Sequence, residues 1–268
     1  MSIITISRGS YSKGKAVAEK LASNLGYECI ARDVIVEAAK EFNITETKLI
    51  RALHDSPSIL DRFTYGKEKY MAYIRHAFLH QVKKDNVVYH GLAGHLFLMH
   101  APNVLKVRII ANMEDRIREE VRRESISENE AKKILIKDDQ ERRKWSQYLY
   151  GVDTWDASLY DLIIHIDKLN VDDAADLISS ASKSPCFRST TETQAYIEDL
   201  YIAGKVQAIL IDRYPTVDTS SQQGVVHVCY KDALGNDQKK ENDITKLLQG
   251  VEGVRKIEFD TVPILVPD

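Results

Sequence analysis

The chain has 268 residues, 44% of them hydrophobic and 29% charged, and its formal net charge is -3. These values are ordinary for a soluble globular protein, and the lack of a basic excess argues against nucleic acid as a partner. The three cysteines are far apart and show no C-x-x-C spacing, which favours neither a disulfide framework nor a zinc site.

No segment is typical of a secretory signal or of a membrane span. The chain begins M-S-I-I-T-I-S-R-G, without a basic leader before a long apolar run, and the apolar stretch 92–101 is interrupted by His95 and His100. An odd number of cysteines fits a reducing compartment. We therefore expect a cytoplasmic protein without a transmembrane segment.

The first two thirds of the chain alternate short apolar runs with segments of helical periodicity. Strands are expected at 3–6, 86–89, 104–111 and 162–166, and helices at 14–25, 33–39, 46–53, 67–84, 113–124, 127–149 and 172–182. Gly26 is typical of a helix end, and residues 56–58 read as a loop. Because strands alternate with helices, we expect an α/β fold with a parallel sheet covered on both faces.

The pattern changes after residues 182–185, which we take as the boundary between a domain at 1–183 and a second at 190–268. Beyond it we expect a helix at 193–213, strands at 224–230 and 254–262, a turn at 233–237 and a helix at 243–248. That order predicts a small α+β unit.

The turn between the first strand and the first helix matches the phosphate-loop pattern G-x-x-x-x-G-K. Its residues are Gly9, Ser10, Tyr11, Ser12, Lys13, Gly14, Lys15 and Ala16. Glycines let several backbone N–H groups converge on one anion, the helix amino terminus adds partial positive charge, and Lys15 adds a full charge. The alternative is a glycine turn with a solvated lysine, but the strand–turn–helix context favours ATP binding.

The residue after the lysine departs from that pattern. It is usually Ser or Thr, whose hydroxyl ligates Mg²⁺, whereas Ala16 offers no ligand. Phosphate binding is compatible with this change, but the Mg²⁺ site is in question. Ser10, Ser12 or water are the candidates to replace the missing hydroxyl.

A strongly charged pair of helices is expected between 112 and 144. One interpretation is a lid whose arginines close on transferring phosphates; the other is a solvated, salt-bridged surface, which composition alone favours. The basic residues are Arg116, Arg118, Arg122, Arg123, Lys132, Lys133, Lys137, Arg142, Arg143 and Lys144.

Five segments in order resemble the cytidylate kinase-like family over roughly residues 1–182. They are I-T-I-S-R-G-S-Y-S-K-G-K near the start, V-V-Y-H-G-L-A-G at 87–94, V-L-K-V-R-I-I-A at 104–111, K-D-D-Q-E-R-R at 137–143 and Y-D-L-I-I-H-I-D at 160–167. The resemblance implies a three-layer P-loop fold with a helical lid and transfer of a phosphate from ATP to a nucleoside monophosphate.

The resemblance also implies roles for individual residues. It assigns Gly9, Gly14 and Lys15 to the ATP phosphates and Arg142, from the D-x-x-R segment, to the lid. Arg116 matches another family arginine less firmly. Asp33 matches an acidic position near the acceptor nucleotide, although a helix N-cap is an equally good interpretation of that residue.

A second departure affects the acceptor side. Where cytidylate kinases carry an arginine that grips the acceptor's phosphate, this chain has Leu92, in Gly91-Leu92-Ala93. His90 or His95 are possible replacements, although a lone histidine is more often a structural hydrogen-bonding group. The acceptor is therefore CMP-like or another small molecule. The alternative is a catalytically degenerate nucleotide sensor.

The carboxy-terminal segments V-Q-A-I-L-I-D-R-Y-P, G-V-V-H-V and V-E-G-V-R-K-I resemble a BON domain. That resemblance implies a binding or regulatory module with a protein or lipid partner, or an oligomerisation surface. Other chemistries have little support. There is no G-x-S-x-G nucleophile motif, and His76 and His80 lack the H-E-x-x-H glutamate of a metal enzyme, so no metal-ligating residues are assigned.

Overall fold

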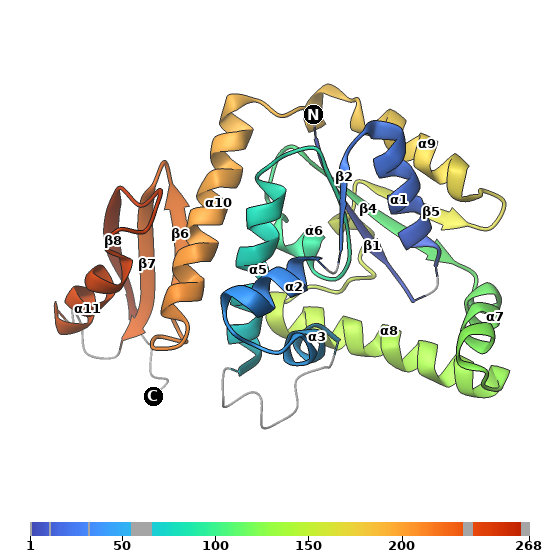
Figure 1. Cartoon of the computed structure of the whole chain (residues 1–268), viewed down its shortest axis with the longest axis horizontal. Coiled ribbons are helices and arrows are strands. Elements are labelled where there is room, and N and C mark those ends of the chain that lie inside the picture. The colour runs from blue at the N-terminus through green and yellow to red at the C-terminus, as the bar shows by residue number, and fades with distance from the viewer. Residues whose placement is uncertain (1, 11, 32, 55–65, 233–237, 264–268) are drawn as a thin grey trace.

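The computed structural model describes residues 2–10, 12–31, 33–54, 66–232 and 238–263 (Figure 1). Its larger sheet has five parallel strands in the order β2-β3-β1-β4-β5. They are β1 (Ile3–Arg8), β2 (Glu28–Ile30), β3 (Val87–His90), β4 (Val104–Ala111) and β5 (Leu162–Ile166). The expected α/β fold with a parallel sheet is confirmed. Tyr11, the loop at 56–58 and the turn at 233–237 lie outside the described residues.

Helices cover both faces of this sheet (Figure 1). On one face, α1 (Gly14–Leu25) and α9 (Val171–Ser182) enclose a core that includes Ile4, Leu21 and Ile178. On the other face lie α2, α3, α5 and α6, whose core includes Phe78 and Tyr89. Their bounds are Asp33–Glu41, Glu46–His54, Gly66–Val82 and Gly94–Phe97. This three-layer arrangement leaves the carboxyl ends of the strands and the start of α1 at one edge.

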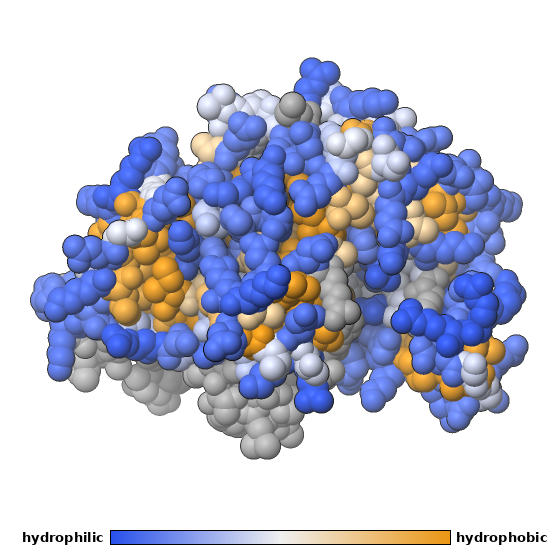
Figure 2. Space-filling model, viewed as in Figure 1, coloured by the Kyte–Doolittle hydropathy of each residue, from blue (hydrophilic) through white to orange (hydrophobic). Residues whose placement is uncertain are grey.

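Two helices, α7 (Met113–Glu124) and α8 (Glu128–Tyr150), form the expected lid and project away from the sheet (Figure 1). A capping box fixes the start of α8, because Ser127 and Glu130 each accept a hydrogen bond from the other's backbone N–H. Apolar residues show at the tip of this pair in Figure 2, and Ile134 and Ile136 of α8 are exposed. The outer half of α8 therefore packs on α7 rather than on the core.

The carboxy-terminal part is a helix followed by a three-stranded sheet in the order β6-β7-β8. β6 and β7 pair antiparallel, and β7 and β8 pair parallel. The elements are α10 (Thr191–Leu210), β6 (Asp218–Gln222), β7 (Val225–Asp232), α11 (Gln238–Leu248) and β8 (Lys256–Pro263). The expected α+β character is confirmed, but β6 was not anticipated and α11 begins five residues before the expected Asp243. Within the described residues, no helix combines the length and apolarity needed to cross a membrane.

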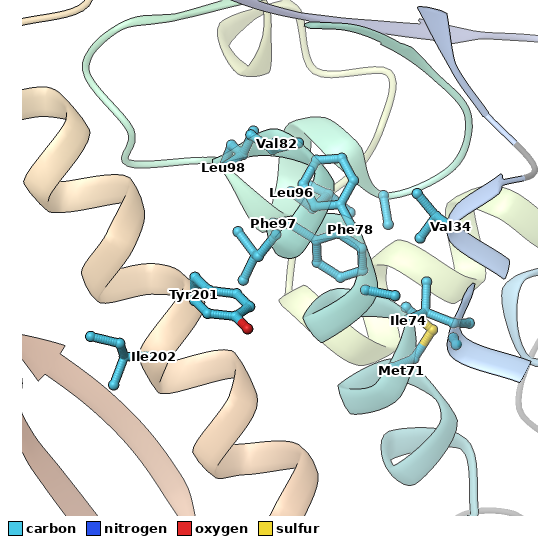
Figure 3. Close-up of a cluster of buried hydrophobic side chains, with 14 of the residues drawn as sticks. Val34, Met71, Ile74, Phe78, Val82, Leu96, Phe97, Leu98, Tyr201 and Ile202 are labelled. Atoms are coloured by element: carbon cyan, nitrogen blue, oxygen red, sulfur yellow. The ribbon is translucent and has the colours of Figure 1, made fainter. Parts of the chain in front are cut away.

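The carboxy-terminal part shares a core with the larger sheet's helices. Figure 3 shows Tyr201 of α10 lying toward Phe78 of α5 and Phe97 of α6. All three side chains belong to one buried cluster, which also contains Val226 and Val228 of β7. Because buried apolar area is the main stabilising term in folding, the two parts stabilise one another through α5 and α10. The boundary drawn between them from the sequence stays a prediction.

Tyr201 is the residue through which we test this shared core. Tyr201→Ala is expected to lower the free energy of unfolding by about 3 kcal/mol, because it removes a buried ring packed between two helices. Tyr196→Ala, on the same helix and 36% exposed, is the matched control and is expected to change it by less than about 0.5 kcal/mol. Urea denaturation measures both, and equal values would contradict the shared core.

Candidate functional site

The glycine-rich turn at the end of β1 has the backbone of an anion-binding loop. α1 begins at Gly14, and the residue before it, Lys13, has a left-handed backbone with φ of 61°. The Ser12 hydroxyl donates to the Gly9 carbonyl at 3.1 Å and folds the loop back on itself. A left-handed non-glycine residue costs energy, and such strain is concentrated at functional sites. The helix start that this turn exposes carries partial positive charge.

Gly14 lies too close to the Arg8 side chain to carry a side chain of its own. A Cβ at this position would lie 2.7 Å from Cδ of Arg8, so a larger residue would displace that side chain. Arg8, at the end of β1, therefore lies directly against the start of α1. Sequence reasoning did not select Arg8, because only the fold places the end of the strand beside residue 14.

Lys15 and Ala16 occupy the first turn of α1. The Lys15 side chain is 65% exposed, and its ammonium lies 3.6 Å from the Glu19 carboxylate one turn along the helix. Lys15 also lines a cavity of about 520 Å³ beside the loop. Ala16 is exposed and supplies no oxygen. The loop therefore has the expected cation but not the expected hydroxyl.

Arg116 of the lid reaches the loop. Its Nε donates to the Ser10 carbonyl at 2.8 Å, and its two terminal nitrogens donate to the carboxylate oxygens of Asp139 at 2.8 and 2.9 Å. The Arg116 side chain is only 9% exposed. A bidentate pair of this kind is strong and geometrically specific. It fixes the lid to the phosphate loop.

Arg142 makes a second contact between the lid and the loop. It donates to the Ser10 hydroxyl at 2.7 Å, and that hydroxyl donates in turn to Asp138 at 3.2 Å. Burial lowers the pKa of the Arg142 guanidinium, while Asp138 and Asp139 oppose that shift. The structure thus brings both predicted lid arginines to Ser10. Other lid arginines, such as Arg118 and Arg122, instead pair with acidic residues on the exposed helix surface.

The 520 Å³ cavity lies between the loop and α2, and its lining residues are of two kinds. Three cations line it, Arg8, Lys15 and Arg142; most of the other lining side chains are apolar or uncharged. These include Ala31, Ile35, Ile50, Tyr89 and Leu92, with His90 among them and Glu19 and Asp33 at the rim. This distribution suits a ligand with an anionic end and a largely uncharged body.

Asp33 is the first residue of α2 and lines the same cavity. A carboxylate there is favoured by the partial positive charge of the helix start. As the first helical residue, Asp33 lies one position beyond the N-cap expected as one interpretation, and its role near the acceptor stays a prediction.

A second cavity, of about 340 Å³, lies on the other side of the loop. Gly9, Ser12 and Arg116 line one end, and Trp155 and Ile163 are among the residues at the other. The phosphate loop is therefore flanked by two hollows, one toward α2 and one toward β5. A loop between two such hollows can hold the phosphates of a ligand in each.

The residues at the loop fit Mg²⁺ only in part. The Ser10 hydroxyl and the Asp138 carboxylate are oxygen donors of the kind that Mg²⁺ prefers, but Ser12 is bonded to Gly9 and Ala16 has no donor. Within the described ranges, no group of three or more His, Cys, Asp or Glu side chains is placed to hold a metal ion. A metal here would depend mainly on phosphate and water oxygens.

Proteins with similar sequences or structures are known. The chain is 28% identical over 176 residues to a cytidylate kinase of Sulfolobus acidocaldarius, covering 65% of this chain and 91% of the relative. It is 30% identical over 187 residues to a cytidylate kinase of Archaeoglobus fulgidus, covering 66% and 93%. The crystal structure of an uncharacterized protein from Eubacterium ventriosum shares the fold, with a TM-score of 0.52, 22% identity and coverage of 69% and 99%.

The five-stranded parallel sheet, the phosphate loop and the helical lid define a protein of the P-loop nucleotide-kinase class. The sequence model of the cytidylate kinase-like family matches residues 3–168. The chain belongs to that family. The match ends before α9 and does not extend to the carboxy-terminal sheet.

Asp139 is the residue through which we test the contact between lid and loop. Asp139→Ala leaves the largely buried guanidinium of Arg116 without its carboxylate, and we expect a loss of unfolding free energy on the order of 3 kcal/mol. Asp115→Ala removes an exposed lid pair with Arg118 and should cost less than about 1 kcal/mol.

A phosphate ligand supplies the missing negative charge. We therefore expect ATP to raise the melting temperature of Asp139→Ala by more than that of the wild type in differential scanning fluorimetry. Equal ATP-dependent shifts in the two proteins would show that Arg116 does not face the phosphates.

Proposed function

We propose that this protein transfers a phosphate from ATP to a nucleoside monophosphate, CMP-like in size, or to another small anionic acceptor. The observation that carries the proposal is the meeting of Arg116 and Arg142 at Ser10, within the phosphate loop. Phosphoryl transfer asks little covalent chemistry of a protein and depends on positioning and charge neutralisation. Two partly desolvated guanidinium groups beside a ring of backbone N–H groups supply that charge.

The donor would bind through the backbone of residues 9–16 and Lys15. The helix start and the convergent N–H groups hold the phosphates, and Lys15 exchanges its exposed contact with Glu19 for a phosphate oxygen. Arg116 would then face the donor phosphates from the lid, and Arg142, which lines the cavity toward α2, would face the phosphate in transit. A bound Mg²⁺ would supply further charge neutralisation, with Ser10 and Asp138 as the protein oxygens at the loop.

The acceptor would bind in the 520 Å³ cavity. The arginine that Leu92 replaces is compensated in this proposal by Arg8, which lines the same cavity from the end of β1. The acceptor's phosphate would lie between Arg8 and Arg142, beside the phosphate loop. Its uncharged body would extend along Ile35, Ile50 and Leu92 toward α2, where Asp33 stands at the rim.

Lys15 provides the test of this proposal. Lys15→Ala is expected to lower kcat/KM for phosphoryl transfer roughly 100- to 1,000-fold, because it removes a charge aimed at the transferring group. Lys20→Ala is the matched control, since Lys20 lies on the same helix and pairs with Asp172 away from the loop. A coupled ADP-release assay with CMP, UMP, AMP, GMP and dTMP at millimolar Mg²⁺ measures both. The proposal fails if the wild type turns over none of these acceptors.

A second candidate function is a degenerate sensor that binds nucleotide without efficient turnover and signals through its carboxy-terminal unit. Two observations favour it. Ala16 removes the usual metal-ligating hydroxyl, and Tyr201 of α10 stacks on His76 of α5 at a centroid separation of 5.4 Å, which links the carboxy-terminal unit to the helices around the acceptor cavity.

Ala16→Ser distinguishes the two candidates. Ala16 is exposed in the first turn of α1, so a serine there can present its hydroxyl to a bound metal without repacking. If the protein is a degenerate sensor, the wild type binds ATP in calorimetry without turnover, and Ala16→Ser raises turnover at least about 10-fold by restoring metal positioning. If the protein is an efficient kinase, wild-type turnover is already substantial and the substitution changes it little.

A further inference from the structure

One wall of the acceptor cavity carries a histidine whose hydrogen-bonding capacity the protein leaves unused. His90 ends β3, is 7% exposed and lines the 520 Å³ cavity. Its Nδ1 is enclosed and has no hydrogen-bond partner among the described residues. Buried polar atoms are almost always paired, and exceptions occur where a ligand or a function completes them.

The second buried histidine of this region is different. His95 is also enclosed, but its Nε2 lies 3.4 Å from the Tyr160 hydroxyl, which is itself hydrogen-bonded to the Thr154 carbonyl at 3.0 Å. His95 thus has a partner that ties α6 to the loop before β5. His76 of α5 also has an unpaired Nδ1, but its Nε2 is bonded to Glu41 and it does not line the acceptor cavity, so His90 is the histidine whose unused capacity faces that site.

His90 is surrounded by groups that decide its charge. Burial and the nearby cations Arg8 and Lys15 lower its pKa, Glu19 and Asp33 partly oppose them, and the result is a pKa of about 4. The imidazole is therefore neutral at pH 7 and can accept one hydrogen bond and donate another. A neutral ring does not replace an arginine as the ligand of an acceptor phosphate.

We propose that His90 is a specificity-determining residue of the acceptor site, which hydrogen-bonds an uncharged polar group of the acceptor: a sugar hydroxyl or the polar edge of a base. This inference rests on the proposed phosphoryl-transfer function. Neither ring nitrogen of His90 has a hydrogen-bond partner among the described residues, and because Nδ1 is enclosed, this proposal gives the contact with the acceptor to Nε2. Arg8 and Arg142 then hold the acceptor's phosphate while His90 reads the uncharged body.

A catalytic role as general base is not needed for a monophosphate acceptor. Its attacking phosphate oxygen is already ionised at pH 7, so no proton has to be removed before transfer. The contribution of His90 is therefore to acceptor binding, and its loss should appear in the KM for the acceptor rather than in the KM for ATP.

The experiment compares His90→Leu, His90→Gln and the control His165→Gln, which alters an exposed histidine of β5. We expect His90→Leu to raise the KM for the acceptor that the wild type uses best about 10-fold or more, because the acceptor's polar group loses its buried hydrogen-bond partner. His90→Gln retains a hydrogen-bonding side chain and should recover most of that loss. The KM for ATP should be unchanged in all three variants.

Pairs of acceptors identify the group that His90 binds. CMP against dCMP tests the 2′-hydroxyl, and CMP against UMP tests the base edge. If one of these pairs is discriminated by the wild type and the discrimination disappears in His90→Leu, the inference holds and the partner group is known. If His90→Leu discriminates between the two acceptors as strongly as the wild type does, the inference is overturned.

The pH profile and the wild-type control separate the remaining outcomes. The acceptor's phosphate itself titrates near pH 6, so a neutral His90 predicts that acceptor KM varies with pH between 6 and 8 in the same way in the wild type and in His90→Leu. An increase in KM near pH 6.5 that occurs in the wild type and is absent from His90→Leu overturns the proposal by showing a cationic His90. If the wild type turns over the acceptor and the KM values of His90→Leu are unchanged, the proposed role of His90 is refuted but the proposed function is not. Absence of turnover in the wild type refutes the proposed function and this inference with it.

Discussion

The arrangement of the site depends on one buried ion pair, between Arg116 and Asp139. Arg116 lies on α7 and Asp139 on α8, and the same guanidinium bonds the Ser10 carbonyl of the phosphate loop. One side chain therefore joins both lid helices to the turn between β1 and α1. Removing a charged group from water is costly, and here the bidentate contact with Asp139 and the hydrogen bond to Ser10 offset that cost for Arg116. In the proposed function, that position of the charge matters. Here that position is the place where a phosphate would carry negative charge.

The local sequence pattern was sufficient to predict most of the helices and strands of the family domain. α1 and α7 have the predicted bounds. α1 carries a regular apolar stripe and ends at Gly26 in a left-handed conformation, whereas α7 was predicted from its run of charged residues. β2 and β6 could not be read in the same way. β2 has three residues, and β6 has the polar sequence D-T-S-S-Q. They become strands because β3 and β7 supply hydrogen-bonding partners, and pairing of that kind is not visible in local periodicity.

The same distinction applies to the site. The phosphate loop was predicted because motif spacing carries its chemistry, and the two lid arginines were assigned through the family resemblance. Arg8 was not selected from the sequence, and His90 was named only as a possible replacement for the missing arginine, because the significance of both depends on neighbours distant in sequence. Arg8 matters through its contact with Gly14 and the cavity near Arg142. His90 matters because nothing among the described residues uses its Nδ1. A motif is contiguous in the sequence and can be recognised there. The wall of a cavity is formed by the ends of separate strands and helices, so its residues cannot be grouped from the sequence alone.

The carboxy-terminal unit meets the family domain at α5, the helix against which α2 also packs. α2 begins at Asp33 on the cavity rim, and further along it Glu37 and Glu41 bond His80 and His76 of α5. The ring of Tyr201, on α10, stacks on His76 and makes a tilted contact with His80. An acceptor that draws α2 toward the phosphate loop must therefore either break these hydrogen bonds or carry α5 with it. These contacts form a continuous packed path from α2 through α5 to Tyr201 of α10.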